Sequence, residues 1–353
     1  MKRRSFVEKS LTTSALAFIP NFSIPAILSK EKMGISQATY AVRWRNKDQV
    51  TDYPAFNDAM EVIEHCHQLD AGGIQWGVGG WTKDFAKKVR KKCDDYGLYF
   101  EGQIRLPQED EDLSRFENDV IASREAGANV NRTACLGGRR YANFSTMTEF
   151  LAFKEKSLKS IERAEPILSK HKTKLAIENH KDWRANELVE IIKKFDSEWI
   201  GVTLDTGNNI SFMEDPMYVI ETLAPYAFST HIKDMAYNEY EDGILLSEVP
   251  LGEGIVDLKM AIALCKKYNP NITFNLEMIT RDPLKVPCLT EQYWATFDHR
   301  ESGKELAMIL KNAKTKTFNL PTTSEKDPRS ILAYEELNNM KSLNYAEQKL
   351  GLF

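Results

Sequence analysis

The stretch Lys174-Leu175-Ala176-Ile177-Glu178 decides the fold of this chain, because it joins a short apolar run to an acidic residue in a pattern that returns further along. The segments that repeat the pattern are 200–205, 227–231 and 272–277, which end in Asp205, His231 and Glu277. Nearly continuous apolar runs of this length are typical of strands buried on both faces, as in parallel sheets. We therefore predict a parallel sheet whose late strands each end in a residue that can bind a metal ion.

Outward from these segments, apolar runs alternate with amphipathic ones over residues 34–313. Further strands are expected at residues 37–44, 73–78, 98–104 and 128–133. Helices are expected at residues 54–68, 84–96, 113–126, 146–171, 185–195, 216–223, 255–268 and 302–312. Gly97 and Gly127 follow two of these helices, at positions where glycine commonly ends a helix. Eight strand–helix units predict an α/β protein of the (β/α)8 TIM barrel class.

The competing architecture is an open, doubly wound sheet that binds a dinucleotide. That fold needs a glycine-rich turn directly after its first strand. The only dense glycine cluster is Gly77-Val78-Gly79-Gly80, which follows the second expected strand and lacks the dinucleotide fingerprint. The closed barrel is therefore the better prediction.

Composition narrows the range of partners. The 353 residues carry a net charge of -4, and 42% of them are hydrophobic. A mildly acidic chain is a poor partner for nucleic acid or anionic membranes, which favour basic surfaces. The five cysteines form no CxxC pair, so neither a disulfide framework nor a zinc knuckle is expected. A small polar molecule is the expected partner.

The first 30 residues differ from the rest. A basic run, Met1–Phe6, precedes a modestly apolar stretch, Leu11–Ile27. This pattern is typical of a twin-arginine export signal, so we predict that residues 1–30 direct the protein to the periplasm. The alternative is a soluble basic N-terminus on a cytoplasmic protein. No other stretch is long and apolar enough to span a bilayer, so the mature form is expected to have no membrane partner.

The repeating pattern stops near residue 313. Residues 314–329 are mostly polar with two prolines, and a last helix is expected at residues 330–350. We predict a C-terminal helical extension over residues 314–353. It packs either against the barrel or against a second subunit, which would make a homo-oligomer.

Glu178, Asp205, His231 and Glu277 form the candidate metal site. In a parallel barrel the carboxyl ends of the strands meet at one mouth, so these residues are expected to converge there. Each alone has an ordinary explanation, as a helix cap or a structural histidine. Four such residues at equivalent positions favour a metal site. Three carboxylates and one imidazole suit Mn²⁺, Mg²⁺, Co²⁺ or Zn²⁺.

The motifs around these residues carry a family resemblance. Ile-Glu178-Asn-His, Asp205-Thr-Gly-Asn, His231-Ile-Lys-Asp and Asn-Leu-Glu277 occur in this order. They resemble the xylose isomerase-like barrels, which include sugar isomerases and epimerases, inosose dehydratases and endonuclease IV-like enzymes. The resemblance implies that the four residues bind the metal. It also implies that Glu178 and Glu277 act as acid and base.

Further residues near strand ends are candidates for the same site. His180 and Lys233 each lie two positions after a predicted ligand, so in an extended segment they face the same way and are candidates for catalysis. A structural histidine and a solvated lysine are the alternatives. The residues expected to line the substrate pocket are Trp76, Arg105, Arg132, Lys181 and Glu253. Trp76 is equally compatible with a place in the core.

Two positions depart from the ketose 3-epimerases of the family. Those enzymes carry a histidine three residues after the metal aspartate and an arginine six after the metal histidine. Asn208 and Tyr237 stand there in this chain. By contrast, His231-Ile232-Lys233-Asp234 is similar to the inosose dehydratase-like branch, which gives more weight to a lyase.

The leading hypothesis is a metal-dependent sugar or cyclitol isomerase or epimerase that moves a proton through an enediolate. The alternative is a dehydratase or hydratase of a keto-sugar or inosose on the same metal site. An abasic-site endonuclease is less favoured, because that activity uses three metals and this chain has only six histidines. A non-catalytic sugar-binding barrel is the remaining hypothesis.

Overall fold

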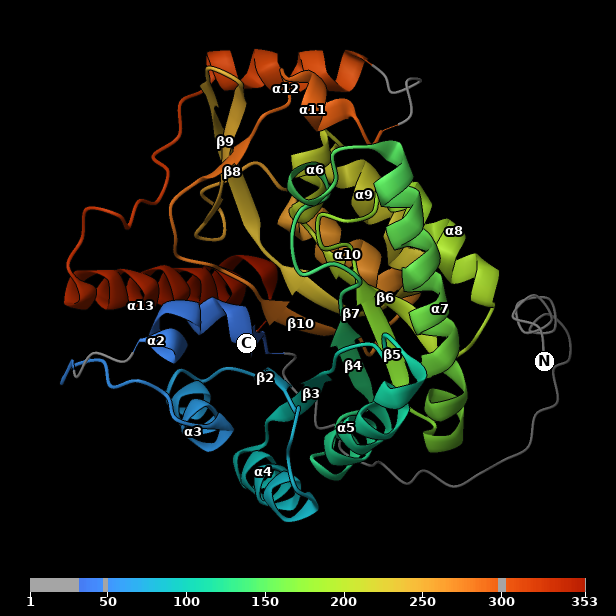
Figure 1. The fold of residues 1–353 in the computed structure, drawn as a ribbon. Coiled ribbons are helices and arrows are strands. Elements are labelled where there is room, and N and C mark those ends of the chain that lie inside the picture. Colours follow the sequence, from blue (N-terminus) through green and yellow to red (C-terminus); the bar gives the residue numbers. More distant parts are fainter. Residues whose placement is uncertain (1–31, 47–49, 298–302, 353) are drawn as a thin grey trace, which may run out of the picture. The chain divides into compact units, whose positions relative to one another are not determined.

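Figure 1 shows the computed structural model, which describes residues 32–46, 50–297 and 303–352. Its centre is a closed barrel of parallel strands in the order β1-β10-β7-β6-β5-β4-β3-β2. These strands are β1 (Gly34–Ser36), β2 (Gly73–Gly77), β3 (Tyr99–Gln103), β4 (Val130–Thr133), β5 (Lys174–Glu178), β6 (Ile200–Asp205), β7 (Ala227–Ile232) and β10 (Thr273–Leu276). The predicted (β/α)8 TIM barrel is confirmed. The predicted signal, residues 1–30, lies outside the described residues.

Helices surround the barrel and connect its strands (Figure 1). The longer ones are α3 (Ala59–Gln68), α4 (Lys83–Tyr96), α5 (Leu113–Glu125), α7 (Met147–His171), α8 (Ala185–Phe195), α9 (Pro216–Leu223), α10 (Leu258–Tyr268), α12 (Gly303–Thr315) and α13 (Pro328–Tyr345). Helix α3 begins at Ala59, later than expected, because the Asp58 side chain caps it by accepting from the backbone of Met60 and Glu61. Gly97 ends α4 with φ 67°, as predicted. None of the described helices is long and apolar enough to cross a membrane.

Short helical elements complete the described chain. They are η1 (Gln37–Tyr40), α2 (Ala41–Arg45), η2 (Asp110–Asp112), α6 (Arg140–Asn143), η3 (Asn208–Phe212), η4 (Ala224–Tyr226), α11 (Glu291–Trp294) and η5 (Ala346–Leu350). Most of them lie in loops between strands and helices, where a single turn changes the direction of the chain.

The prediction of a strand at residues 37–44 is wrong. The first strand, β1, is three residues long and ends at Ser36, and η1 and α2 follow it directly. Tyr40 and Arg43 are both buried and lie three residues apart, which is the spacing of one helical face. The apolar run in this region therefore belongs to a helical turn rather than to a strand.

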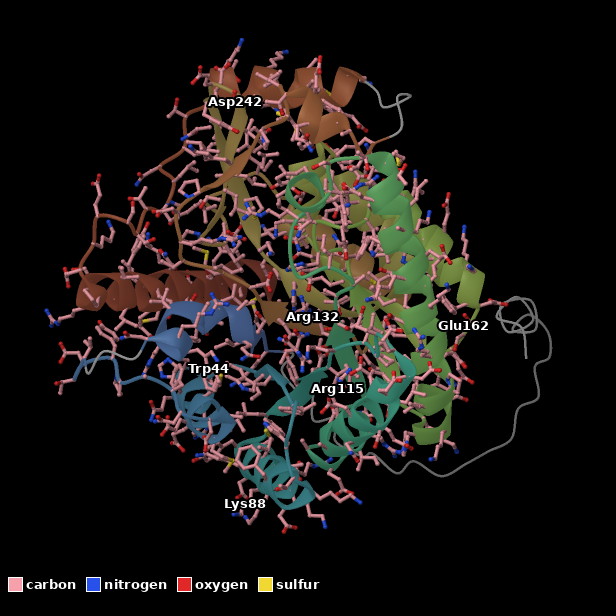
Figure 2. The ribbon with its side chains drawn as sticks, in the orientation of Figure 1. Trp44, Lys88, Arg115, Arg132, Glu162 and Asp242 are labelled. Carbon is pink, nitrogen blue, oxygen red and sulfur yellow. The ribbon has the colours of Figure 1, made fainter. Side chains whose placement is uncertain are left out.

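Between β7 and α10 the chain forms strands that were not predicted. Strands β8 (Asp234–Tyr240) and β9 (Gly243–Val249) form an antiparallel hairpin, and β11 (Leu284–Val286) adds to it as a third strand. Gly243 has a φ of 153°, which favours glycine in the turn. The labelled Asp242 marks the tip of this hairpin in Figure 2, away from Arg132 on the barrel. A second, smaller core forms against the hairpin.

Helix α13 packs on the chain's own barrel and is held there by buried polar contacts. The Glu335 carboxylate accepts hydrogen bonds from the backbone N–H of Val42 (2.7 Å) and Arg43 (3.0 Å). Asn339 Nδ2 donates to the Thr39 carbonyl at 3.1 Å. Glu335 therefore supplies acceptors to α2, which follows the barrel's first strand. The alternative of packing against a second subunit stays a prediction.

We expect Glu335→Ala to lower the free energy of unfolding by about 3 kcal/mol, because it leaves two buried N–H groups unpaired. Glu335→Gln should lower the free energy of unfolding by less, since the amide oxygen of glutamine can still accept hydrogen bonds. Urea unfolding followed by circular dichroism measures both. The exposed Glu325→Ala is the control and should change stability by less than about 0.5 kcal/mol. Equal losses for Glu325→Ala and Glu335→Ala would contradict this role for Glu335.

Candidate metal centre

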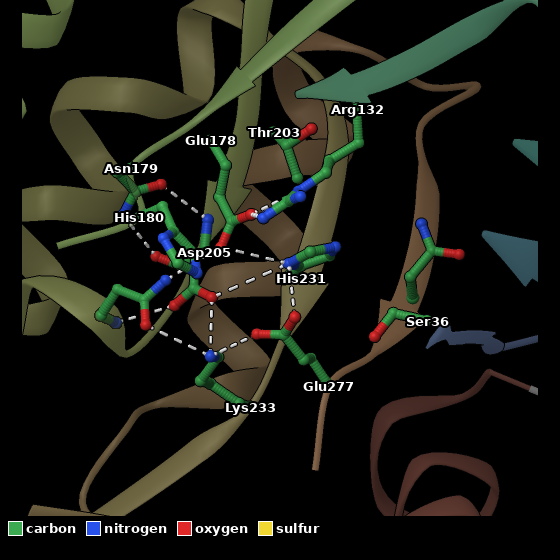
Figure 3. A network of polar contacts seen from close by, with 12 residues as sticks. Ser36, Arg132, Glu178, Asn179, His180, Thr203, Asp205, His231, Lys233 and Glu277 are labelled. Carbon is green, nitrogen blue, oxygen red and sulfur yellow. Dashed lines mark hydrogen bonds and ion pairs between the residues drawn. The ribbon is translucent and has the colours of Figure 1, made fainter. Parts of the chain in front are cut away.

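The four predicted ligands come together at the mouth of the barrel. Glu178, Asp205 and His231 lie at the ends of β5, β6 and β7, and Glu277 directly follows β10. One potential ligand atom from each lies within 4.8 Å of all the others, and all four residues are buried. Figure 3 shows their side chains pointing toward one another. Parallel pairing explains the convergence, because it places Asp205 directly beside His231 on the neighbouring strand.

Two buried atoms of this group face the shared space, where they lie at ion-pairing distance from charged groups of the cluster. They are His231 Nδ1 and Asp205 Oδ2. His231 Nδ1 lies 3.2 Å from Glu277 Oε1 and 3.4 Å from Glu178 Oε1. Burial lowers the pKa of His231, but Glu277 and Glu178 outweigh burial and raise it to about 10. The cluster therefore attracts positive charge, and the donor set fits a divalent cation.

A chain of hydrogen bonds orients the imidazole of His231. Its Nε2 donates to Gln75 Oε1 at 2.6 Å, and Gln75 Nε2 donates to Glu101 Oε2 at 2.9 Å. Because Glu101 sets which end of the Gln75 amide faces His231, Nε2 keeps its proton, and it is Nδ1 that would give up its proton and present a lone pair to a bound cation. Sequence reasoning missed Gln75 and Glu101. Their only signal was a polar residue within each of two otherwise buried strands.

Asp205 is held by backbone and amide groups. Its Oδ1 accepts from the N–H of Gly207 (2.8 Å) and Asn208 (2.7 Å). The Asn179 side chain accepts from Asp205 N and donates to Asp205 O, at 2.8 and 2.9 Å. These bonds use one carboxylate oxygen and leave Oδ2 facing the cluster.

Arg132 pairs with Glu178. Its Nε lies 2.6 Å from Glu178 Oε2, while Asn208 Nδ2 donates to Glu178 Oε1 at 3.0 Å. Burial raises the pKa of Glu178, but Arg132 and His231 outweigh burial and hold it well below its usual range. Arg132 was predicted to line the substrate pocket, and here it also neutralises a predicted ligand.

Lys233 lies inside the cluster, as predicted from its position after His231. Its Nζ is 2.5 Å from Glu277 Oε2, 2.9 Å from Asp205 Oδ2 and 3.8 Å from Glu248 Oε1. Figure 3 shows it between Asp205 and Glu277. Burial lowers the pKa of Lys233, but these carboxylates outweigh burial and raise it above its usual value. Glu248 comes from the unpredicted hairpin and also binds Arg281, with 2.7 Å between Oε1 and the guanidinium.

His180 and Lys181 follow β5 at the edge of the cluster. His180 Nδ1 donates to the Leu136 carbonyl at 2.9 Å, and burial lowers the pKa of the ring to about 4. The imidazole is therefore neutral, with a free lone pair on Nε2. Lys181 is buried, and its ammonium contacts Asn208 Oδ1.

Other predicted pocket residues lie elsewhere. Trp76 belongs to the main core and packs edge-on against Trp44, because its neighbour Gln75 takes the inward side of β2. Arg105 is exposed and lines a cavity of about 430 Å³ that Arg132 also lines. The structure does not bring Glu253 to the cluster, since this residue is exposed and pairs with Lys341 of α13.

Comparison with known proteins agrees with the fold. Residues 57–305 match the family described as the xylose isomerase-like TIM barrel. A curated relative, 3-oxo-isoapionate decarboxylase from Pectobacterium atrosepticum, is 26% identical over 245 residues, which cover 68% of this chain and 82% of that protein.

Solved structures share the fold. One is a xylose isomerase-like TIM barrel protein from Mycobacterium smegmatis in complex with magnesium, with a TM-score of 0.54, 15% identity, and coverage of 79% of this chain and 97% of that one. Another is D-psicose 3-epimerase in the presence of D-fructose, with a TM-score of 0.54, 14% identity, and coverage of 80% and 96%. With its closed barrel and its match over most of its length, this chain belongs to the xylose isomerase-like TIM barrel family.

Proposed function

We propose that this protein is a divalent-metal-dependent enzyme that forms an enolate from a keto-sugar or a related keto acid. Glu178, Asp205, His231 and Glu277 would hold the ion. The observation that carries the proposal is the buried group of four potential ligand atoms, one from each residue, which lie within 4.8 Å of one another. When bound, a divalent cation supplies a Lewis acid that stabilises negative charge on a ketone oxygen.

The pairing of the glutamates favours a lyase over an epimerase. Epimerisation needs two groups that exchange protons on opposite faces of one carbon, with pKa values near the working pH. Glu178 is paired with Arg132, and Glu277 is paired with Lys233. Burial raises the pKa of Glu277, but His231 and Lys233 outweigh it and hold the pKa well below its usual range. Both carboxylates are therefore weak bases, better suited to binding a cation than to removing a C–H proton.

We infer that the enolate arises by loss of a neighbouring carboxylate as carbon dioxide, because the electrons of the broken C–C bond form the enolate and no C–H proton has to be removed. The activity of the curated relative, a decarboxylase, supports this inference. Lys233 would return a proton to the substrate, since its ammonium lies among the ligands. His180 would hold a substrate hydroxyl through its free Nε2. The isomerase or epimerase predicted first from the sequence is the second candidate, because both glutamates do lie in the cluster.

We expect purified protein to take up about one equivalent of Mn²⁺. Asp205→Asn should weaken the binding at least about tenfold by removing a charged ligand, and Gln75→Met should weaken it about 10- to 100-fold by freeing His231. Isothermal titration calorimetry and elemental analysis measure both. The exposed Glu347→Gln is the control. If wild-type protein binds no Mn²⁺, and Mn²⁺ does not raise its melting temperature, the metal proposal fails.

Proton NMR in D₂O, with mass spectrometry, separates the two candidate reactions. Mn²⁺-loaded protein is incubated with a panel of keto-sugars and keto acids. A lyase should release water or carbon dioxide and give a product of lower mass. Exchange of a single C–H, with every oxygen retained, would instead favour the epimerase. Glu178→Gln should abolish either activity, whereas Glu347→Gln should leave it unchanged.

A further inference from the structure

Lys181 has a backbone conformation that is unfavourable for lysine. Its φ is 62°, in the left-handed region that favours glycine. The other described non-glycine residues with positive φ are Asp70, Lys172, Asp196 and Met213, and each follows or ends a helix. Lys181 instead lies in the loop between β5 and α8, at the barrel mouth. Such a conformation persists only where the surrounding structure imposes it, which is common at functional sites.

The Lys181 ammonium is buried without an acidic partner. The residue is 5% exposed, and the hydrogen bond made by its Nζ goes to Asn208 Oδ1. Within the described part of the chain, no carboxylate lies at ion-pairing distance from this nitrogen. Burial, together with the cations Lys233 and Arg281, lowers the pKa of Lys181 to about 8, and the carboxylates of Glu248 and Asp205 only partly offset these effects. The side chain is thus still mostly charged at neutral pH, and a buried charge without a counter-ion is costly.

A second ammonium approaches the same acceptor. Lys233 Nζ lies 3.3 Å from Asn208 Oδ1. One neutral amide oxygen therefore accepts from two ammonium groups, of which Lys233 is also paired with Asp205 and Glu277. A divalent ion held by Asp205 and Glu277 would draw on the carboxylates that now compensate Lys233, and positive charge at Asn208 would then be less compensated. Asn208 occupies the position where the ketose 3-epimerases carry a histidine.

This pair of ammoniums lies close to the metal ligands. Asn208 Oδ1 accepts hydrogen bonds from both ammonium groups. Asn208 Nδ2 donates to Glu178 Oε1 at 3.0 Å. An anionic group bound by the lysines would therefore lie one side chain away from the candidate metal centre. This spacing suits a carboxylate bonded to the ketone carbon or to the carbon next to it. A phosphate ester at the far end of a sugar would lie further from the reacting carbon.

We propose that Lys181 and Lys233 bind a carboxylate of the substrate, so that the substrate is a keto acid rather than a neutral sugar. This inference rests on the proposed function for the position of the ketone. It assigns Lys181 to substrate recognition and explains why a lysine occupies a position that favours glycine.

The test compares two ligands that differ only at one carbon. 2-Keto-D-gluconate and D-fructose share their ketone and hydroxyl configuration, but the first carries a carboxylate where the second carries a hydroxymethyl group. Calorimetry on Mn²⁺-loaded and on metal-free protein measures both affinities. We expect wild-type protein to bind the acid about tenfold or more tightly than D-fructose. Equal affinities, tighter binding of D-fructose, or no binding of either would overturn the proposal.

Lys181→Met removes the charge at similar length. We expect it to weaken binding of the acid and to reduce the preference for the acid to within about twofold. Lys172→Met is the matched control, because Lys172 is also a lysine with positive φ (49°) but is exposed at the end of α7. The control should keep the full preference. An unchanged preference in Lys181→Met would overturn the role of Lys181.

Two further measurements separate the alternatives. Lys181→Gly should raise the melting temperature by about 2 °C, because glycine accepts the positive φ and the buried charge is gone; a lower melting temperature would mean that Lys181 is structural. D-Fructose 6-phosphate tests the other anion, and tighter binding of this phosphate than of the acid would overturn the assignment to a carboxylate.

If Mn²⁺ binds and keto-sugars are converted without preference for acids, only this inference fails. If Mn²⁺ does not bind but the preference depends on Lys181, only the proposed function fails.

Discussion

Three carboxylates buried at one end of a barrel impose the constraint on which the rest of this site depends. Buried negative charges are costly unless cations or hydrogen-bond donors compensate them. Arg132 compensates Glu178, and Lys233 lies between Asp205 and Glu277. These pairs hold the pKa values of both glutamates below their usual range. The same cations that allow the cluster to be buried therefore also keep its glutamates charged.

Neutral polar side chains refine the positions that the barrel provides. Asn179 and the loop after β6 engage one side of Asp205, and Gln75 engages one nitrogen of His231. In each of these two residues, one side-chain atom makes hydrogen bonds and a second side-chain atom faces the shared space. Asn208 links this inner group to Lys181. Lys233 and Arg132 contact the metal-type residues directly, whereas Lys181 is joined to them through the amide of Asn208.

Much of the fold could be predicted because each strand carries its own local signal. Strands such as β5 and β6 are buried on both faces, so their apolar runs are nearly continuous and their ends stand out. The first strand was mispredicted because it has only three residues, and the apolar residues after it belong to a helix. The β8–β9 hairpin was missed because polar residues such as Asn238 and Glu239 interrupt its apolar pattern. Trp76 was taken as a pocket candidate because the sequence does not reveal which side of β2 faces inward.

The sequence by itself determined the order of strands and helices and the four residue types that end the late strands. These features follow from local periodicity and from the rule that parallel strands share one carboxyl edge. Only the tertiary structure decided which partners those residues have. Gln75 meets His231, and Arg132 meets Glu178, because closing the barrel brings distant strands within hydrogen-bond distance. The unpaired charge of Lys181 is likewise a tertiary property, since no local pattern specifies which acids a buried lysine will lack.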